Sequence, residues 1–286
     1  MDRLLSVVVS VYNEEKALED FYKETTGILK DIDWAYELIF VNDGSSDQSL
    51  AILERLSASD RAVKVVSFSR NFGQEAAMIA GLDYSSGDGI ICMDADLQHP
   101  PECIPVILNR LTQGYEVINM VRTRNKTAGF IKNITSSGFY WLINHLSDVH
   151  FEANASDFFA ISRHVAQVLK ENYREKVRFL RGYVQNVGFK KTTIEYEARA
   201  RVAGESKYSI KKLFVFSINT ILCFSNMPLK LGIYAGIFSA MLGLLVMIYT
   251  LFTRRGAPSG YANIVVLICI MFARTFGIIG IIGDYI

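Results

Sequence analysis

Two long apolar runs near the C-terminus set the strongest limit on how this 286-residue chain can fold. Residues 231–252 read LGIYAGIFSAMLGLLVMIYTLF, and residues 261–283 form a second apolar run whose one charge is Arg274. A helix that crosses a membrane needs about 20 apolar residues, and both runs are that long. We therefore expect a two-helix transmembrane hairpin within residues 229–286, in preference to a pair of buried core helices. Arg274 is a functional candidate, although it could equally pair at a subunit interface or snorkel.

The chain before these runs alternates strand and helix patterns. Apolar runs at residues 4–13, 36–47, 62–69 and 88–96 are separated by segments with helical spacing. Near-continuous Val/Ile strands joined by helices predict an α/β domain with a mainly parallel sheet covered on both faces. The net charge of +1 gives no indication of a nucleic-acid partner.

Polar residues follow each predicted strand. They are Tyr12 to Glu15, Asn42 to Asp47, Arg70 and Asn71, and Asp94 to Asp96. Ligands of open parallel sheets bind outside the carboxyl ends of the strands. We expect these residues to line one polar crevice.

Asp94 and Asp96 end the fourth strand with two carboxylates one residue apart. Hard oxygen ligands suit Mg²⁺ or Mn²⁺, which often bind one or two carboxylates together with substrate phosphates. Gln98 could add a carbonyl oxygen, and His99 is a weaker candidate. The alternative is that the acids cap the next helix, which begins near Pro100 and Pro101. The convergence of the other polar strand ends favours a site for a metal and a diphosphate.

Several segments in order carry a resemblance to a known family. They are SVVVSVYNEE, ELIFVNDGSSD, SRNFGQEAAMIAGLDYSSGD, MDADLQHPPE, ASDFFAISR, RFLRGYVQNVGF and YEARARVAGESKYSIKKL. The chain resembles family 2 glycosyltransferases of the polyprenyl-phosphate branch, which includes the bactoprenol glucosyltransferases and relatives of dolichyl-phosphate mannose synthase. The segment ASDFFAISR departs from the usual Gly-Asp-Phe-Arg opening on the acceptor side.

The resemblance implies a domain organisation. Residues 1–208 would form a Rossmann-like A-type glycosyltransferase domain, and residues 209–228 would form interfacial amphipathic helices. Residues 229–286 would carry the two transmembrane helices, at about 231–252 and 261–283.

The resemblance also implies a donor site. Asp43 would bind the nucleotide base, and the backbone around Val9, Ser10 and Tyr12 would line the nucleoside pocket. Glu14 would face the ribose, Asp94 the ribose and diphosphate, and Asp96 with Gln98 would hold the divalent metal. Asp157 would be a catalytic carboxylate near the sugar. It would act as a base, orient an acceptor-binding Arg or Lys, or stabilise positive charge that develops at the sugar C1.

The acceptor side is expected to be basic, because a polyprenyl phosphate carries up to two negative charges. The residues expected there are Arg122, Arg124, Lys132, Ser136, Arg201, Ser206 and Lys207. The alternative is a solvated basic face that is attracted to anionic lipid.

The resemblance implies an inverting, metal-dependent hexosyltransferase that transfers glucose from UDP-glucose to undecaprenyl phosphate. A GDP-mannose-dependent mannose synthase and a non-enzymatic nucleotide-sugar-binding membrane protein remain alternatives. The expected location is a bacterial inner membrane, multi-pass, with the catalytic domain cytoplasmic. Whether the protein is a homo-oligomer is left open.

Overall fold

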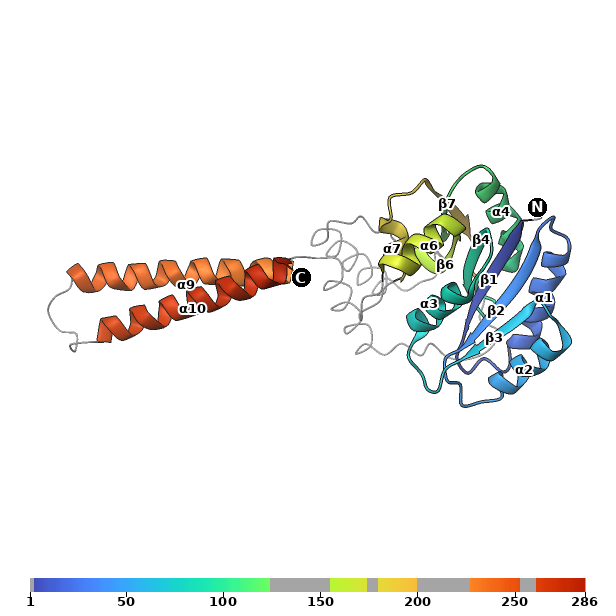
Figure 1. Ribbon diagram of the computed structural model, residues 1–286, viewed down its shortest axis with the longest axis horizontal. Helices are drawn as coiled ribbons and strands as arrows, with labels where there is room; N and C mark the ends of the chain where they lie inside the picture. The colour runs from blue at the N-terminus through green and yellow to red at the C-terminus, as the bar shows by residue number, and fades with distance from the viewer. Residues whose placement is uncertain (1–2, 124–154, 174–179, 200–226, 253–260, 286) are drawn as a thin grey trace. The chain divides into compact units, whose positions relative to one another are not determined.

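The computed structural model describes residues 3–123, 155–173, 180–199, 227–252 and 261–285 (Figure 1). The chain divides into two compact units. The described part of the first unit runs from residue 3 to residue 199, and that of the second from residue 227 to residue 285. The boundary between the two units lies outside the described residues. So do the expected interfacial helices at residues 209–228, apart from residues 227 and 228.

A seven-stranded sheet in the order β3-β2-β1-β4-β6-β5-β7 forms the centre of the first unit. Pairing is parallel between β3, β2, β1 and β4, and between β5 and β7. Strand β6 runs antiparallel to both of its neighbours, β4 and β5. This arrangement confirms the expected mainly parallel sheet. The strands are β1 (Leu4–Val11), β2 (Ala35–Asn42), β3 (Val63–Ser67), β4 (Gly89–Asp94), β5 (Val117–Arg122), β6 (Ala155–Ser162) and β7 (Lys191–Tyr196).

Helices cover both faces of the sheet, as the apolar runs predict. Val7, Val9 and Phe40 face a core shared with α1, α2 and α4. Helix α3 packs on the other face, over Val8 and Val41, and contacts α6 and α7 there. The helices are α1 (Leu18–Lys30), α2 (Ser49–Ser59), α3 (Gln74–Tyr84), the short 3₁₀ helix η1 (Pro101–Cys103), α4 (Ile104–Thr112), α6 (Arg163–Asn172) and α7 (Leu180–Asn186).

Gly81 allows α3 to approach the sheet closely. A Cβ atom at this position would lie 2.2 Å from Cγ1 of Val8, a fully buried side chain of the central strand. Gly81→Ala is therefore expected to lower the free energy of unfolding by about 1–3 kcal/mol through overpacking. Gly27→Ala in α1 is the matched control, because a Cβ there meets nothing within 4 Å and alanine favours a helix. Thermal unfolding of the full-length protein, followed by circular dichroism, compares the two. Equal midpoints would contradict this account of the packing.

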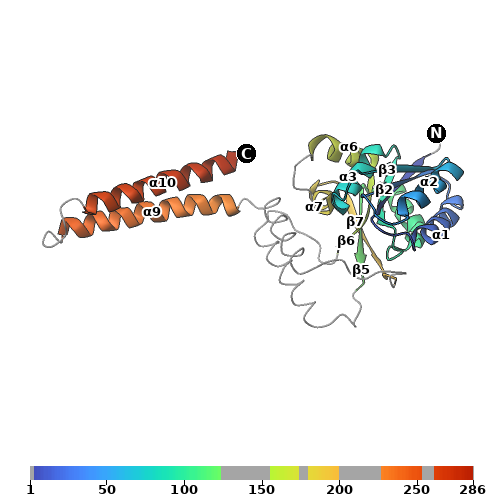
Figure 2. The same ribbon diagram turned by 90° about the horizontal axis from the view of Figure 1, so that it is seen from below.

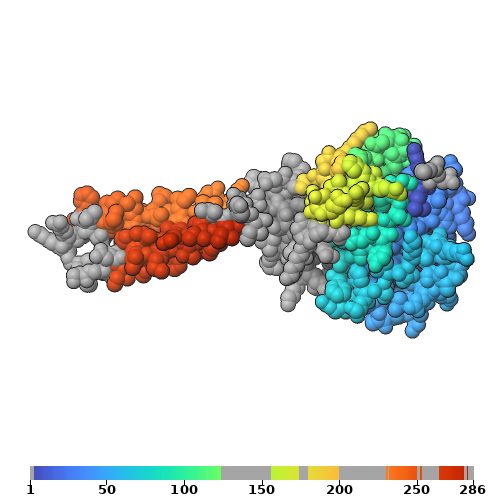
Figure 3. All heavy atoms as spheres, in the orientation of Figure 1, coloured from blue at the N-terminus to red at the C-terminus, as the bar shows by residue number. Residues whose placement is uncertain are grey.

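The second unit contains two long helices, α9 (Met227–Phe252) and α10 (Tyr261–Tyr285), which lie side by side (Figures 1 and 2). Small residues allow close packing: a Cβ at Gly236 would lie 3.0 Å from the Ala273 carbonyl, and one at Gly243 would lie 2.8 Å from Cys269 Cβ. Their atoms form one continuous body in the space-filling view (Figure 3).

The outward faces of this pair are strongly apolar. In α9, residues Gly232–Tyr249 have a mean hydropathy of 1.9, and only 11% of them are buried. Of the described helices, α9 alone has an apolar stretch long enough to cross a membrane; that of α10 is shorter, Ile264–Ile279. Arg274 is exposed on α10. The helical pair is thus present where the sequence predicts it.

Candidate functional site

The loops that follow β1 and β2 are fastened to each other. Asn13, with a φ of 55°, accepts a hydrogen bond at Oδ1 from the Ser46 N–H (2.8 Å), and its own N–H donates to Ser45 Oγ (3.0 Å). The Glu14 N–H donates to Ser49 Oγ at 2.9 Å. Because the last pair of these strands is Val11 with Asn42, both loops leave the sheet at one level. They form one rim of the carboxyl edge.

Asp43 fastens the loop that follows β3. Its Oδ1 accepts from the Phe72 N–H (2.7 Å), its Oδ2 accepts from the Gly73 N–H (2.9 Å), and the side chain is buried. The next residue, Gly44, has a φ of +64°, and a Cβ there would lie 2.3 Å from the Arg70 carbonyl carbon. Both carboxylate oxygens therefore already hold the backbone of this loop. Base recognition by Asp43 stays a prediction, and any such contact would have to use a second lone pair of an occupied oxygen.

The other residues expected in the donor site lie at different depths. Val9 is fully buried, and its backbone lies between Phe40 and Met93 in the sheet. Tyr12, by contrast, is exposed just beyond the end of β1. Val9 thus lies below the rim, and Tyr12 lies at it.

Asp94 lies at the last position of β4, and the chain turns immediately after it. Its Oδ1 accepts from Ser10 Oγ (2.9 Å) and from Gln74 Nε2 (2.7 Å). Asp96 is buried, and its Oδ1 accepts from the Gln98 N–H (3.1 Å). Leu97, between them, has a φ of 60°, which non-glycine residues adopt only in tight turns. Asp94 therefore ends the strand, and Asp96 belongs to the turn that follows it.

Strand β6 brings Asp157 beside these acids. The antiparallel register pairs Cys92 with Phe159, and two residues further along it Asp157 is level with Asp94. Gln74 Nε2 lies 3.5 Å from Asp157 Oδ2, and Arg181 Nη1 lies 3.5 Å from Asp157 Oδ1. Gln74 thus lies between the two carboxylates, and Arg181 supplies a nearby positive charge.

Burial and the accumulated negative charge raise the pKa values of two carboxyl groups here. Burial, followed by the charges of Asp157 and Asp96, raises the pKa of Asp94 to about 7. Burial and the charge of Asp157 likewise raise the pKa of Glu75 to about 8. Glu75 accepts a hydrogen bond from the Leu180 N–H at 2.7 Å. Ionised carboxylates crowded in this way are stabilised by a cation.

The oxygen atoms that this turn offers as ligands fit a divalent metal. Asp94 and Asp96 offer hard oxygen ligands, and Gln98 follows them in the same turn. His99 does not act as a free ligand at Nδ1, because that atom accepts from the Asp94 N–H at 3.0 Å. Its ring is buried, and burial followed by the charge of Arg122 lowers the His99 pKa to about 4, so the ring is neutral.

Of the residues expected on the acceptor side, only Arg122 belongs to the described part of the chain. Arg122 ends β5, and its Nε donates to the hydroxyl of Tyr196 on β7 at 3.0 Å. The other residues expected there lie outside the described part: Arg124, Lys132, Ser136, Arg201, Ser206 and Lys207.

Three residues of the site escaped the sequence prediction: Gln74, Glu75 and Arg181. The first two had a signal, because they are polar residues at the start of an otherwise apolar helix, directly after the third polar strand end. Arg181 had none, since its short helix α7 reaches Asp157 only through tertiary packing.

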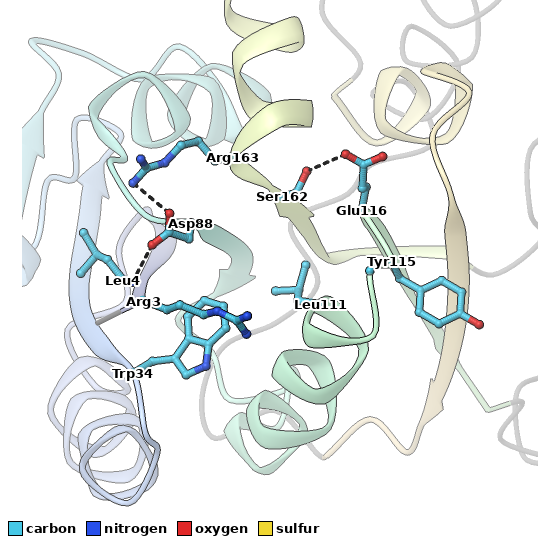
Figure 4. A pocket seen from close by; sticks show the side chains of 10 residues that line it. Arg3, Leu4, Trp34, Asp88, Leu111, Tyr115, Glu116, Ser162 and Arg163 are labelled. Atoms are coloured by element: carbon cyan, nitrogen blue, oxygen red, sulfur yellow. Dashed lines mark hydrogen bonds and ion pairs between the residues drawn. The ribbon is translucent and has the colours of Figure 1, made fainter. Parts of the chain in front are cut away.

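A cavity of about 730 Å³ lies elsewhere, at the amino ends of β1, β2, β4 and β5 and the carboxyl end of β6 (Figure 4). Its charged groups are engaged with their surroundings: Asp88 accepts from the Leu4 N–H at 2.9 Å and lies 3.3 Å from Arg163 Nη2. Arg3 lies over the Trp34 ring, 5.4 Å from its centroid. The residues that line the cavity include none of those expected at the crevice.

Comparison with known proteins identifies the family of this chain. The family model described as glycosyl transferase family 2 matches residues 6–169. The glycosyltransferase YkcC of Bacillus subtilis is 40% identical over 284 residues, which cover 98% of this chain and 88% of that protein. The bactoprenol glucosyl transferase of Shigella phage SfV is 36% identical over 285 residues, covering 99% and 92%.

A solved structure has the same fold at low sequence identity. Glucosyl-3-phosphoglycerate synthase from Mycobacterium tuberculosis, in complex with Mn²⁺, UDP-glucose and phosphoglyceric acid, aligns with a TM-score of 0.52 and 20% identity. The alignment covers 77% of this chain and 78% of that one. The chain described here therefore belongs to glycosyl transferase family 2, and its sheet and helices form an A-type glycosyltransferase fold.

Proposed function

We propose that this glycosyltransferase is a membrane-anchored, inverting enzyme that transfers glucose from UDP-glucose to a polyprenyl phosphate such as undecaprenyl phosphate. The observation that carries the proposal is the acid cluster of Asp94, Asp96 and Asp157 at the carboxyl edge of the sheet. It occurs in a chain that aligns over nearly its whole length with proteins named bactoprenol glucosyl transferase. Such an enzyme would supply a lipid-linked sugar for cell-surface glycan modification.

On the donor side, Asp94 and Asp96, with Gln98, would hold Mg²⁺ or Mn²⁺. The cation would neutralise charge on the leaving diphosphate, an effect worth several kcal/mol. Ser10 and Gln74 hold the Asp94 carboxylate through Oδ1, at 2.9 and 2.7 Å. The nucleoside would lie along the rim that Tyr12, Glu14 and Asp43 help to form.

On the acceptor side, Arg122 would bind the lipid phosphate together with Arg201, Ser206 and Lys207. An ionised phosphate oxygen can attack C1 of the sugar without losing a proton, so Asp157 need not act as a base. We assign to Asp157 the stabilisation of positive charge at C1, with Arg181 and Gln74 fixing its side chain. One in-line displacement inverts the anomer, so an α-linked donor gives a β-linked product.

The pair α9–α10 would anchor the enzyme in the membrane. The free energy of exposing the apolar faces of these helices is low in lipid and high in water. Four basic residues flank the first apolar run on its N-terminal side, and two lie between the runs. Because basic residues are enriched on the cytoplasmic side of a membrane, the larger group favours a cytoplasmic catalytic domain. These residues are Lys207, Lys211, Lys212 and Lys230 on the one side, and Arg254 and Arg255 on the other.

A radiolabel assay tests the proposal. Full-length protein in detergent, given undecaprenyl phosphate and a divalent metal, is incubated with labelled UDP-glucose or labelled GDP-mannose. Label from UDP-glucose is expected in the organic-extractable lipid, with a β-phosphate linkage in the NMR spectrum. Label from GDP-mannose alone would identify a mannose synthase, and nucleotide binding without transfer to lipid would identify a binding protein. An α linkage would exclude the single displacement.

A further inference from the structure

His99 is almost completely buried, with 1% of its surface exposed, and ends the turn from Asp94 to His99, called the acid turn below. It makes one hydrogen bond within this turn, to the backbone of Asp94. Its Nδ1 accepts from the backbone N–H of Asp94 at 3.0 Å, so the proton of the neutral ring resides on Nε2. Among the described residues that Nε2 atom has no hydrogen-bond partner. A buried N–H without a partner costs free energy. A phenyl ring at this position would avoid that cost. The feature of His99 that a phenyl ring cannot supply is therefore the hydrogen-bond acceptor Nδ1.

The ring of His99 is held by two aromatic side chains from other strands. It stacks on Phe158 of β6, with centroids 5.0 Å apart and planes 20° apart. Tyr196 of β7 meets it edge-on at 6.1 Å and 79°. Phe158 directly follows Asp157, and Tyr196 accepts the hydrogen bond from Arg122. The ring therefore connects the acid turn to β6, which carries Asp157, and to Tyr196 of β7, the hydrogen-bond partner of Arg122.

The acid turn requires such support. Leu97 adopts a left-handed backbone conformation between Asp96 and Gln98, which is unfavourable for a residue with a branched side chain. Within the turn, the bond from the Gln98 N–H to Asp96 Oδ1 is local, whereas His99 fastens the end of the turn back onto its start at Asp94.

We propose that His99 is a positioning residue, whose Nδ1 closes the turn from Asp94 to His99 and thereby aims the two carboxylates at the metal and diphosphate. The proposal rests on the proposed function in one respect, because it takes the ligand of this turn to be a divalent cation with a nucleoside diphosphate. It differs from a metal-ligand role for His99, since the ring acts through the backbone of Asp94.

Two substitutions separate the acceptor atom from the ring. His99→Phe keeps an aromatic ring for stacking and removes the acceptor, while His99→Asn keeps an acceptor at the position of Nδ1 and removes the ring. The readout is the affinity of full-length protein for Mn²⁺ in the presence of UDP, measured by electron paramagnetic resonance of free Mn²⁺. We expect His99→Phe to weaken this affinity about tenfold, the effect of one lost hydrogen bond, and His99→Asn to remain within about threefold of wild type.

The outcomes are distinct. Wild-type Mn²⁺ affinity in His99→Phe overturns the proposal, and so does a tenfold loss in His99→Asn. If His99→Phe does not fold, His99→Asn decides alone. A Mn²⁺ affinity within about threefold of wild type supports the proposal, and a loss of about tenfold overturns it. Wild-type protein that binds Mn²⁺ with UDP but transfers no sugar to lipid would refute the proposed function and leave the role of His99 standing. Normal transfer by wild type, with unchanged Mn²⁺ affinity in His99→Phe, would refute only the role of His99.

Discussion

Asp96→Asn is expected to reduce glucose transfer to polyprenyl phosphate about a thousandfold, with the protein still folded. The amide has nearly the same shape as the carboxylate but lacks the charge that would hold a cation. Loss of a metal that stabilises the leaving diphosphate removes several kcal/mol of transition-state stabilisation, and about 4 kcal/mol corresponds to a thousandfold in rate. Initial rates with saturating UDP-glucose and Mn²⁺ give the measurement.

Asp33→Asn is the matched control for this variant. Asp33 is an exposed acid before β2 and lies outside the acid cluster, so transfer should stay within about twofold of wild type. Full activity of Asp96→Asn, or of the wild-type enzyme in excess chelator, would contradict the metal assignment.

Asp157→Asn is expected to lower kcat about a hundredfold, with the KM values for both substrates within about threefold. The reason is that a negative charge beside C1 acts in the transition state, where positive charge develops, and loss of one charge-assisted interaction costs about 1.5–3 kcal/mol. Steady-state kinetics with each substrate varied in turn provide the test. A raised KM for the lipid phosphate at unchanged kcat would instead show that Asp157 orients the acceptor.

The same variant should change the pH dependence of metal binding. The pKa of Asp94 is raised to about 7 by burial and then by Asp157, so protons compete with a cation for Asp94 as the pH falls through about 7. Removing the charge of Asp157 removes one cause of that shift. At limiting Mn²⁺, the midpoint of binding should therefore move to lower pH in Asp157→Asn and stay in place in Asp33→Asn.

The first four strands could be predicted from the sequence, because each apolar run ends in polar residues, and the runs of β1, β2 and β4 are buried on both faces. The acid turn could be predicted too, since Asp94 and Asp96 lie where such a strand ends. The position of Asp157 could not be obtained from local pattern. It depends on an antiparallel pairing between β4 and β6, strands far apart in the chain, and only the family resemblance placed it near the sugar.

The contacts that orient the acids were the least predictable. Gln74 contacts Asp94 across the sheet edge, and Arg181 reaches Asp157 from a seven-residue helix. His99 looked like a weak metal ligand because a sequence shows its imidazole but not the backbone N–H that its Nδ1 accepts from. Hydrogen bonds of this kind depend on tertiary packing, which leaves no periodic signal in the sequence.

The place of β6 in the sheet has a consequence for the order in which the enzyme is made. Within the described sheet, β5 pairs only with β6 and β7, and both leave the ribosome after it. The half with the acid turn can pair β1 to β4 early, but β5 has no strand to join until β6 inserts beside β4. Because Asp157 is part of β6, it reaches its place beside Asp94 only when β6 pairs with β4. A nascent chain thus acquires its full acid cluster only after β6 has paired with β4.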